Sequence, residues 1–147
     1  MRIRITVMRV SVVKSRLSAY IEGMRQTFDI KGGPQDGRAH LPLVREQLAA
    51  QKLDGLYVPH DDEYQNEYLP DANERLAWVS GFTGSFGSAF VFTDRAVIFA
   101  DGRYTLQVVD QTDPDLWEVQ SVPEPGPFGW LKSQDMSGKR IGYDPKL

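Results

Sequence analysis

The sequence predicts an α/β fold in which a mixed β-sheet is flanked by helices. Segments with helical apolar spacing alternate along the 147-residue chain with short apolar runs that are typical of buried strands. The composition, 41% hydrophobic with 11% aromatic residues, is sufficient for the core of one domain of ordinary size. Because helices and strands alternate, we expect a single mixed sheet covered by the helices.

The first predicted elements are a loop, a helix and a strand. Residues 30–37 are rich in Gly, Pro and Asp and predict a loop. An amphipathic helix is expected over 40–54, with Pro42 in its first turn and Gly55 as its stop signal. The apolar run 55–59 predicts a buried strand.

The second half of the chain continues this alternation. Residues 60–74 are polar and turn-rich and predict a loop, and a short helix is expected within 74–82 until Gly81 ends it. Residues 88–100 contain two apolar runs joined by Thr-Asp-Arg, which predicts a β-hairpin. A helix, a strand, a helix and a strand are then expected over 103–112, 116–122, 127–133 and 140–145.

Charge and composition exclude several classes of protein. Residues 26–147 contain eleven basic and nineteen acidic residues, and this net charge of −8 argues against nucleic-acid binding, which requires a basic surface. The lack of cysteine excludes disulfides, thiolate metal sites and cysteine nucleophiles. No apolar run has the length of a signal peptide or membrane span, so we expect a cytoplasmic protein without a membrane partner.

The amino-terminal residues differ from the rest in charge. Residues 1–25 contain six basic residues and only one acid, Glu22. We expect them to be a disordered extension, upstream or vector-derived, before a start at Met24, with the domain itself over 26–147. An organelle transit peptide is the alternative. An ordered, packed strand within residues 1–23 would contradict this expectation.

The sequence offers no convincing metal or nucleophile site. The two histidines, His40 and His60, lie twenty residues apart, and the acidic residues after His60 are more typical of a solvated loop. The serines between residues 80 and 88 lack the Gly-x-Ser-x-Gly context of a hydrolase. We therefore predict neither a catalytic residue nor a metal ligand in this chain.

Three glycines recur at every third position, Gly81, Gly84 and Gly87. A phosphate loop runs from strand to helix, whereas these glycines follow a predicted helix and precede a strand. We interpret them as a tight helix-to-strand connection with close backbone approach. Trp78 and Phe82, on either side of Gly81, are expected to pack under this loop or to line a pocket.

The motif Asp101-Gly102-Arg103-Tyr104 is the most suggestive part of the sequence. Asp101 follows a strand and can cap the next helix, and Gly102 permits a sharp turn. Arg103 would stand in the first turn of that helix, where the helix dipole disfavours a cation and an anion should compensate. Two interpretations stay open: a salt bridge to an acid such as Asp101 or Glu74, or contact with a ligand carboxylate, which a guanidinium binds through two parallel hydrogen bonds.

Three segments in order, NEYLP (66–70), ERLAWVSGFTGS (74–85) and DGRYTLQ (101–107), resemble the amino-terminal domain of cytosolic-type Xaa-Pro aminopeptidase in the creatinase/prolidase superfamily. The resemblance covers about residues 26–147. It implies the fold of that amino-terminal domain, with its ribonuclease H-like motif. Phe86 stands where the family often has a small residue, so we expect a bulkier loop there.

The resemblance also implies a function. It implies a parent enzyme that removes the first residue from peptides with proline in position two, using two divalent ions, expected to be Mn²⁺, in a catalytic pita-bread domain absent from this chain. The isolated chain is then expected to be inactive. Arg103 is expected to contact the substrate, with His60, Glu63 and Tyr68 as neighbours near the cleft.

The partners implied by the resemblance are Xaa-Pro peptides, the carboxyl-terminal domains of the same protein, and a second copy in a homodimer of the intact enzyme. Two alternatives remain open. The same domain could belong to a non-hydrolytic peptide- or histone-binding protein, and the presence or absence of metal ligands in the missing catalytic domain would distinguish this case. It could also belong to a prolidase or creatinase, and the length of the peptides that the full-length protein cleaves would distinguish that case.

Overall fold

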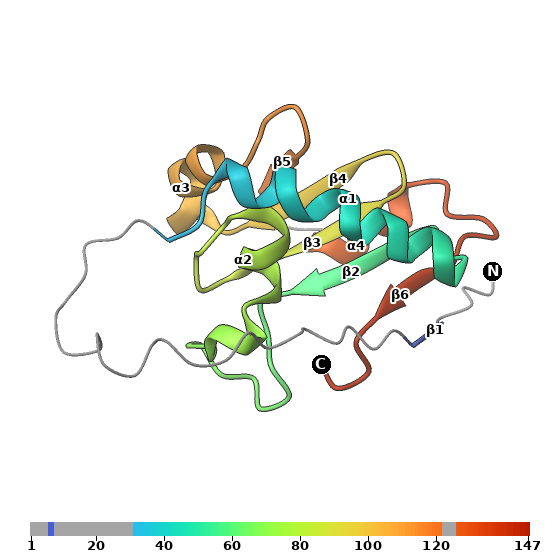
Figure 1. Cartoon of the computed structure of the whole chain (residues 1–147), viewed down its shortest axis with the longest axis horizontal. Helices are drawn as coiled ribbons and strands as arrows, with labels where there is room; N and C mark the ends of the chain where they lie inside the picture. Colours follow the sequence, from blue (N-terminus) through green and yellow to red (C-terminus); the bar gives the residue numbers. More distant parts are fainter. Residues whose placement is uncertain (1–5, 8–30, 122–125) are drawn as a thin grey trace, which may run out of the picture.

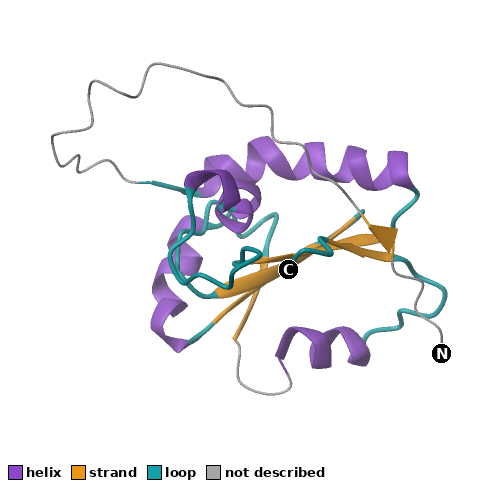
Figure 2. Ribbon diagram, turned by 90° about the horizontal axis from the view of Figure 1, so that it is seen from below, coloured by secondary structure: helices purple, strands orange, loops and turns teal. Residues whose placement is uncertain are grey.

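The structure, a computed structural model, describes residues 6–7, 31–121 and 126–147. In this part of the chain a mixed sheet carries helices on both faces (Figure 2), which confirms the predicted fold class. The strand β1 (Thr6–Val7) is all that is described within the expected amino-terminal extension, and it pairs in parallel with β6 (Ile141–Tyr143). These two residues therefore belong to the sheet, although the extension was expected to be disordered. The remaining residues of that extension lie outside the described residues, and the boundary at residue 26 stays a prediction.

The sheet has the strand order β1-β6-β2-β3-β4-β5 among the described residues (Figure 1). The three central strands β2, β3 and β4 are antiparallel to one another, whereas β6 is parallel to β2 and β5 is parallel to β4. The ends of β2 and β4 and the start of β3 therefore meet at one end of the sheet. The strands are β2 (Gly55–Pro59), β3 (Gly87–Phe92), β4 (Ala96–Ala100), β5 (Glu118–Ser121) and β6 (Ile141–Tyr143).

Two buried clusters lie on opposite faces of this sheet. The aliphatic cluster joins the sheet to α1 (Pro34–Gln51), α2 (Arg75–Ser80) and α3 (Thr105–Gln111). The aromatic cluster joins it to α4 (Gly126–Ser133) and centres on Phe90, which is fully buried. The alternation of side chains along the strands produces this division, because successive residues of a strand point to opposite faces.

The predicted hairpin is confirmed, with β3 and β4 paired antiparallel, and the helices and strands predicted from residue 55 onward are present within a few residues of their expected limits. The loop predicted over residues 60–74 is also confirmed, apart from a short 3₁₀ turn, Asp71–Asn73.

The predicted start of the first helix is wrong. Helix α1 begins at Pro34, inside the segment predicted as a loop, so Pro42 lies within the helix rather than in its first turn. Pro34 fits the start of a helix because its missing N–H would have no partner there. Gly37 is buried in α1, where an added Cβ would meet Nε1 of Trp117 at 2.9 Å. This tertiary contact places a turn-forming residue inside a helix.

The predicted stop of this helix also differs. Helix α1 ends at Gln51, and Lys52 takes the left-handed conformation with φ 54°. Gly55 instead begins β2, where an added Cβ would meet the ring of Phe92 at 2.8 Å. Packing of the strand pair, rather than the end of the helix, therefore explains a glycine at this position.

Candidate functional site

Three loops meet at the end of the sheet where β2 and β4 end and β3 begins. They comprise residues 60–74, 81–86 and 101–104. The backbone N–H of His60 donates to the carbonyl oxygen of Gly87 at 2.9 Å, which joins the first loop to the start of β3. The topology thus brings the predicted neighbours of Arg103 to the same end of the sheet as Arg103 itself.

The glycine-rich loop packs closely, as the sequence predicted. Gly81 has φ 87°, and an added Cβ would lie 2.0 Å from the carbonyl oxygen of Gly33. At Gly84 an added Cβ would lie 2.3 Å from the ring of Phe82, which is itself buried. Side chains larger than hydrogen are excluded at both positions, and Phe82 packs under the loop instead of lining a pocket.

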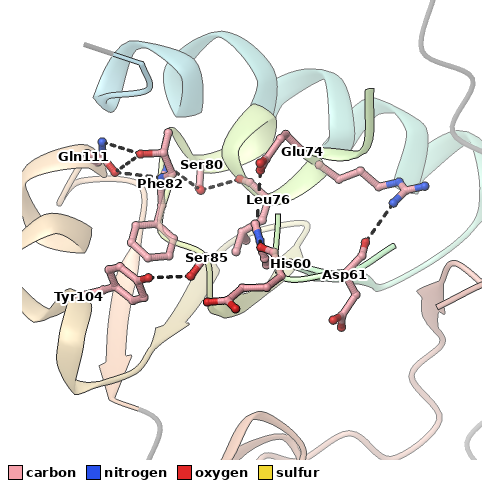
Figure 3. Close-up of polar contacts among 12 residues, drawn as sticks. His60, Asp61, Glu74, Leu76, Ser80, Phe82, Ser85, Tyr104 and Gln111 are labelled. Atoms are coloured by element: carbon pink, nitrogen blue, oxygen red, sulfur yellow. Dashed lines mark hydrogen bonds and ion pairs between the residues drawn. The ribbon is translucent and has the colours of Figure 1, made fainter. Parts of the chain in front are cut away.

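Polar contacts hold this loop against α3. The N–H of Thr83 donates to Oε1 of Gln111 at 2.9 Å. The hydroxyl groups of Ser85 and Tyr104 lie 2.7 Å apart (Figure 3). The ring of Phe82 meets the ring of Tyr104 edge to face, with centroids 5.6 Å apart. The residue that follows Arg103 is therefore fixed on two sides.

Arg103 lies in a 3₁₀ turn, Gly102–Tyr104, immediately before α3. Asp101 accepts the backbone N–H of Arg103 at 2.9 Å and so caps this 3₁₀ turn, whereas the sequence predicted a cap on the helix that follows. The Asp101 carboxylate also binds the Arg103 side chain, lowering the pKa of Asp101 and raising that of Arg103. The salt bridge is thus made with Asp101 and not with Glu74, and 61% of the Arg103 side chain stays exposed.

His60 is nearly buried and connects the first loop to α2. Its Nδ1 lies 3.7 Å from Oε2 of Glu74, and its Nε2 lies 3.3 Å from the carbonyl oxygen of Glu67 (Figure 3). Burial raises the pKa of the adjacent Asp61 carboxyl. The contacts of His60 with Glu67 and Glu74 indicate that its side chain stabilises the conformation of the loop over residues 60–74.

The other predicted neighbours of Arg103 differ in exposure. Glu63 forms an ion pair with Lys146 near the carboxyl-terminal end, with 3.3 Å between Oε2 and Nζ. Tyr68 is 83% exposed. Neither side chain has a hydrogen bond to Arg103 among the described residues.

Sequence reasoning missed Asp62, which organises the loop. Its carboxylate accepts the N–H groups of Tyr64 and Asn66, each at 3.0 Å, and the side-chain amide of Asn66 at 2.8 Å. These bonds, led by the backbone N–H of Asn66, lower the pKa of Asp62. The signal available in the sequence was an aspartate followed by turn-forming polar residues, which is typical of an Asx turn.

Sequence reasoning also missed an apolar groove of about 220 Å³ beside α1 and α2. Leu43, Leu56 and Val79 contribute to its apolar lining, and Trp78 lines it while stacking on His40 with ring centroids 4.2 Å apart. Trp78 thus takes the pocket-lining role that the sequence left open.

No three His, Asp or Glu side chains among the described residues come together as a metal site would require. No helix in the same part of the chain has both the length and the apolar character needed to cross a membrane.

Comparison with known proteins gives consistent matches. The family model of the Creatinase/Prolidase N-terminal domain matches residues 41–147. Xaa-Pro aminopeptidase 2 of Homo sapiens is 37% identical over 108 residues, which are 73% of this chain and 16% of that protein. The chain thus spans less than a fifth of the length of this relative.

Two solved structures share the fold. The X-prolyl aminopeptidase of Caenorhabditis elegans, described as a cytosolic enzyme with a di-nuclear active site, matches with a TM-score of 0.67 and 28% identity over 76% of this chain and 20% of that chain. The amino-terminal domain of the cytoplasmic peptidase PepQ from Mycobacterium tuberculosis matches with a TM-score of 0.52 and 29% identity, covering 71% of this chain and 72% of that chain.

Proposed function

Because the chain belongs to the creatinase/prolidase N-terminal domain family, we propose that it is the non-catalytic amino-terminal domain of a metal-dependent Xaa-Pro aminopeptidase. The enzyme removes the first residue from peptides with proline in position two. Its two divalent ions, Mn²⁺ in this proposal, are held by residues beyond this domain and supply Lewis acidity and an activated water. The di-nuclear active site described for the nematode enzyme supports the number of ions.

The observation that carries this proposal is the exposed Arg103 at the end of the sheet. A guanidinium that remains charged and accessible is suited to a peptide carboxylate or carbonyl group. The domain thus contributes a substrate contact while the chemistry takes place elsewhere in the enzyme. In this proposal His60 shapes the adjacent loop, and Glu63 and Tyr68 lie at the margin of the peptide cleft.

Exposed apolar side chains on two of these loops, residues 60–74 and 81–86, and on α3 support contact with another part of the enzyme. A group of such side chains is typical of an interaction surface. We assign this surface to the carboxyl-terminal domains of the same protein, and we propose a homodimer for the intact enzyme. We also propose a cytoplasmic location, which the description of the nematode relative as a cytosolic enzyme supports. The exposed side chains are Tyr64, Tyr68, Phe86, Leu106 and Val109.

The test is peptide hydrolysis by the parent enzyme and by the 147-residue chain, each supplied with Mn²⁺. We expect the parent to release the first residue from an Arg-Pro-Pro peptide and the isolated chain to release none. Turnover that follows the isolated chain through chromatography would contradict the proposal. Peptide binding by the parent without hydrolysis would instead indicate a non-hydrolytic binding protein, and cleavage restricted to Xaa-Pro dipeptides would indicate a prolidase.

A further inference from the structure

We propose that Asp101 is a positioning residue, which holds one edge of the Arg103 guanidinium so that the opposite edge stays free for a substrate carboxylate. The inference rests on the proposed function, because it assigns the substrate group that Arg103 meets. Asp101 does not itself touch the substrate in this proposal. It decides which edge of the Arg103 guanidinium is presented to the substrate.

The hydrogen bonds define which edge is occupied. Oδ2 of Asp101 accepts from Nε of Arg103 at 2.9 Å and from Nη2 at 2.8 Å. Oδ1 accepts from the backbone N–H of Arg103 at 2.9 Å and from Nε at 3.3 Å. A guanidinium has five N–H donors in a fixed plane, and Asp101 uses the edge formed by Nε and Nη2.

The other edge, formed by Nη1 and the outer hydrogen of Nη2, keeps three donors. Among the described residues, Nη1 of Arg103 donates to no protein group. Two of these donors point in parallel, which is the arrangement that the two oxygens of a carboxylate accept. The free edge therefore fits a carboxylate, such as the carboxyl terminus of a short peptide, better than a single carbonyl oxygen.

The surroundings of Arg103 restrict its guanidinium further. The guanidinium carbon lies 5.3 Å from the centroid of the Tyr104 ring. Tyr104 is itself held by the hydroxyl of Ser85 and by the ring of Phe82. A side chain fixed before binding loses less conformational freedom when the ligand arrives, which lowers KM without a new contact.

The charge of Asp101 does not cancel this role. Its carboxylate raises the pKa of Arg103, so the guanidinium stays protonated. Because the pair is solvent-exposed, it adds little to fold stability. Orientation of the free edge is therefore the effect that we assign to Asp101.

The first experiment measures the order of the Arg103 side chain in the 147-residue chain by ¹⁵N relaxation of its Nε–H group. We expect an ordered Nε–H in the wild type and a mobile one in Asp101→Asn, whose amide can still accept the backbone N–H of Arg103. If the asparagine variant does not fold, the same measurement is made on Asp101→Ser, which keeps a capping oxygen without a carboxylate. The matched control is Asp113→Asn, which should release Arg38 but leave Arg103 unchanged. Equal order of Arg103 in the wild type and Asp101→Asn would overturn the proposal.

The second experiment measures kinetics in the parent enzyme with a short Xaa-Pro peptide and its carboxyl-terminal amide. We expect Asp101→Asn to raise KM for the free carboxylate about three- to tenfold, with kcat unchanged and little effect on the amide. The double variant with Arg103→Ala should be no worse than Arg103→Ala alone. A lowered KM, an equal effect on the amide, or additive effects would contradict the positioning role. A parent enzyme without peptidase activity would refute the proposed function, while the relaxation measurement would still decide whether Asp101 orders Arg103.

Discussion

Gly33 and Gly81 lie backbone against backbone: the N–H of Gly33 donates to the carbonyl oxygen of Gly81 at 3.0 Å, and a Cβ at Gly81 would lie 2.0 Å from the carbonyl oxygen of Gly33. This contact joins the start of α1 to the end of α2 and fixes the root of the glycine-rich loop. The close approach, rather than any phosphate binding, explains the first glycine of the loop.

The contact predicts that Gly81→Ala destabilises the domain more than a glycine substitution with the same backbone strain alone. Gly138 is the matched control, because its φ is 74° and an added Cβ would meet no atom within 4 Å. We expect Gly138→Ala to cost about 1 kcal/mol, and Gly81→Ala roughly 1–3 kcal/mol more through overpacking. Urea unfolding of both variants measures the difference, and equal losses would show that the backbone contact is unimportant.

The aromatic cluster gives a second prediction. Phe90 is fully buried and packs against Trp130, with ring centroids 6.1 Å apart. The ring of Phe128 also lies 6.0 Å from that of Phe90, but its side chain is 55% exposed. We expect Phe90→Ala to lower the free energy of unfolding by about 3–5 kcal/mol because it leaves a cavity. Phe128→Ala should cost less than half as much. Similar losses for the two variants, measured by urea denaturation, would contradict this assignment of the core.

The loop over residues 60–74 should depend on Asp62. Asp62→Ala removes three hydrogen bonds within the loop, so we expect faster cleavage there in limited proteolysis. Glu63→Ala, at the neighbouring position, removes only an exposed ion pair with Lys146 and should leave the cleavage rate near that of the wild type. Fragments identified by mass spectrometry locate the cuts. Equal cleavage rates for the two variants would contradict this role of Asp62.

Acid should destabilise the domain. The backbone N–H of Asn66 lowers the pKa of Asp62, and the Arg38 side chain lowers that of Asp113. A carboxyl with a lowered pKa in the folded state stabilises the fold above its unfolded value of about 3.9, and this contribution is lost as pH falls through the folded value. Burial raises the pKa of Asp61, and protonation of this carboxyl in acid therefore favours the folded state. Among the described residues this is the only carboxyl whose pKa is clearly raised.

Unfolding by urea at pH 7, 5 and 3 tests this dependence. We expect stability to change little between pH 7 and 5 and to fall below about pH 4. Asp62→Asn should show a smaller loss on acidification, because one of the carboxylates with a lowered pKa is gone. Stability that rises toward pH 3 would contradict the direction of these pKa shifts.

Local patterns carried most of the fold prediction. The hairpin of β3 and β4 could be predicted because both strands and their turn are adjacent in the sequence. The start of α1 could not, because Gly33, Pro34 and Gly37 form a typical turn sequence, and only the packing of Gly37 against Trp117 explains its place in a helix. The placement of β6 beside β2 also depends on pairing between distant segments, which periodicity does not report.

The candidate site was predictable to a similar extent. The motif around Arg103 indicated both a cap and an anionic partner, and Asp101 supplies both. Which acid pairs with Arg103, and which guanidinium edge remains free, depends on side-chain geometry that one sequence does not contain. The apolar groove was missed for the same reason, because separate elements form its walls.

The central claim is that this domain contributes a substrate contact, through Arg103, to chemistry performed elsewhere in the enzyme. Its matched control is Arg38, which is also paired with an aspartate and has a side chain 65% exposed, compared with 61% for Arg103. The decisive measurement is KM of the parent enzyme for a Xaa-Pro peptide, together with its metal content, in Arg103→Ala and Arg38→Ala. We predict that Arg103→Ala raises KM roughly tenfold or more with metal content unchanged, while Arg38→Ala leaves KM near the wild-type value. An unchanged KM in Arg103→Ala, or loss of metal from it, would contradict the claim.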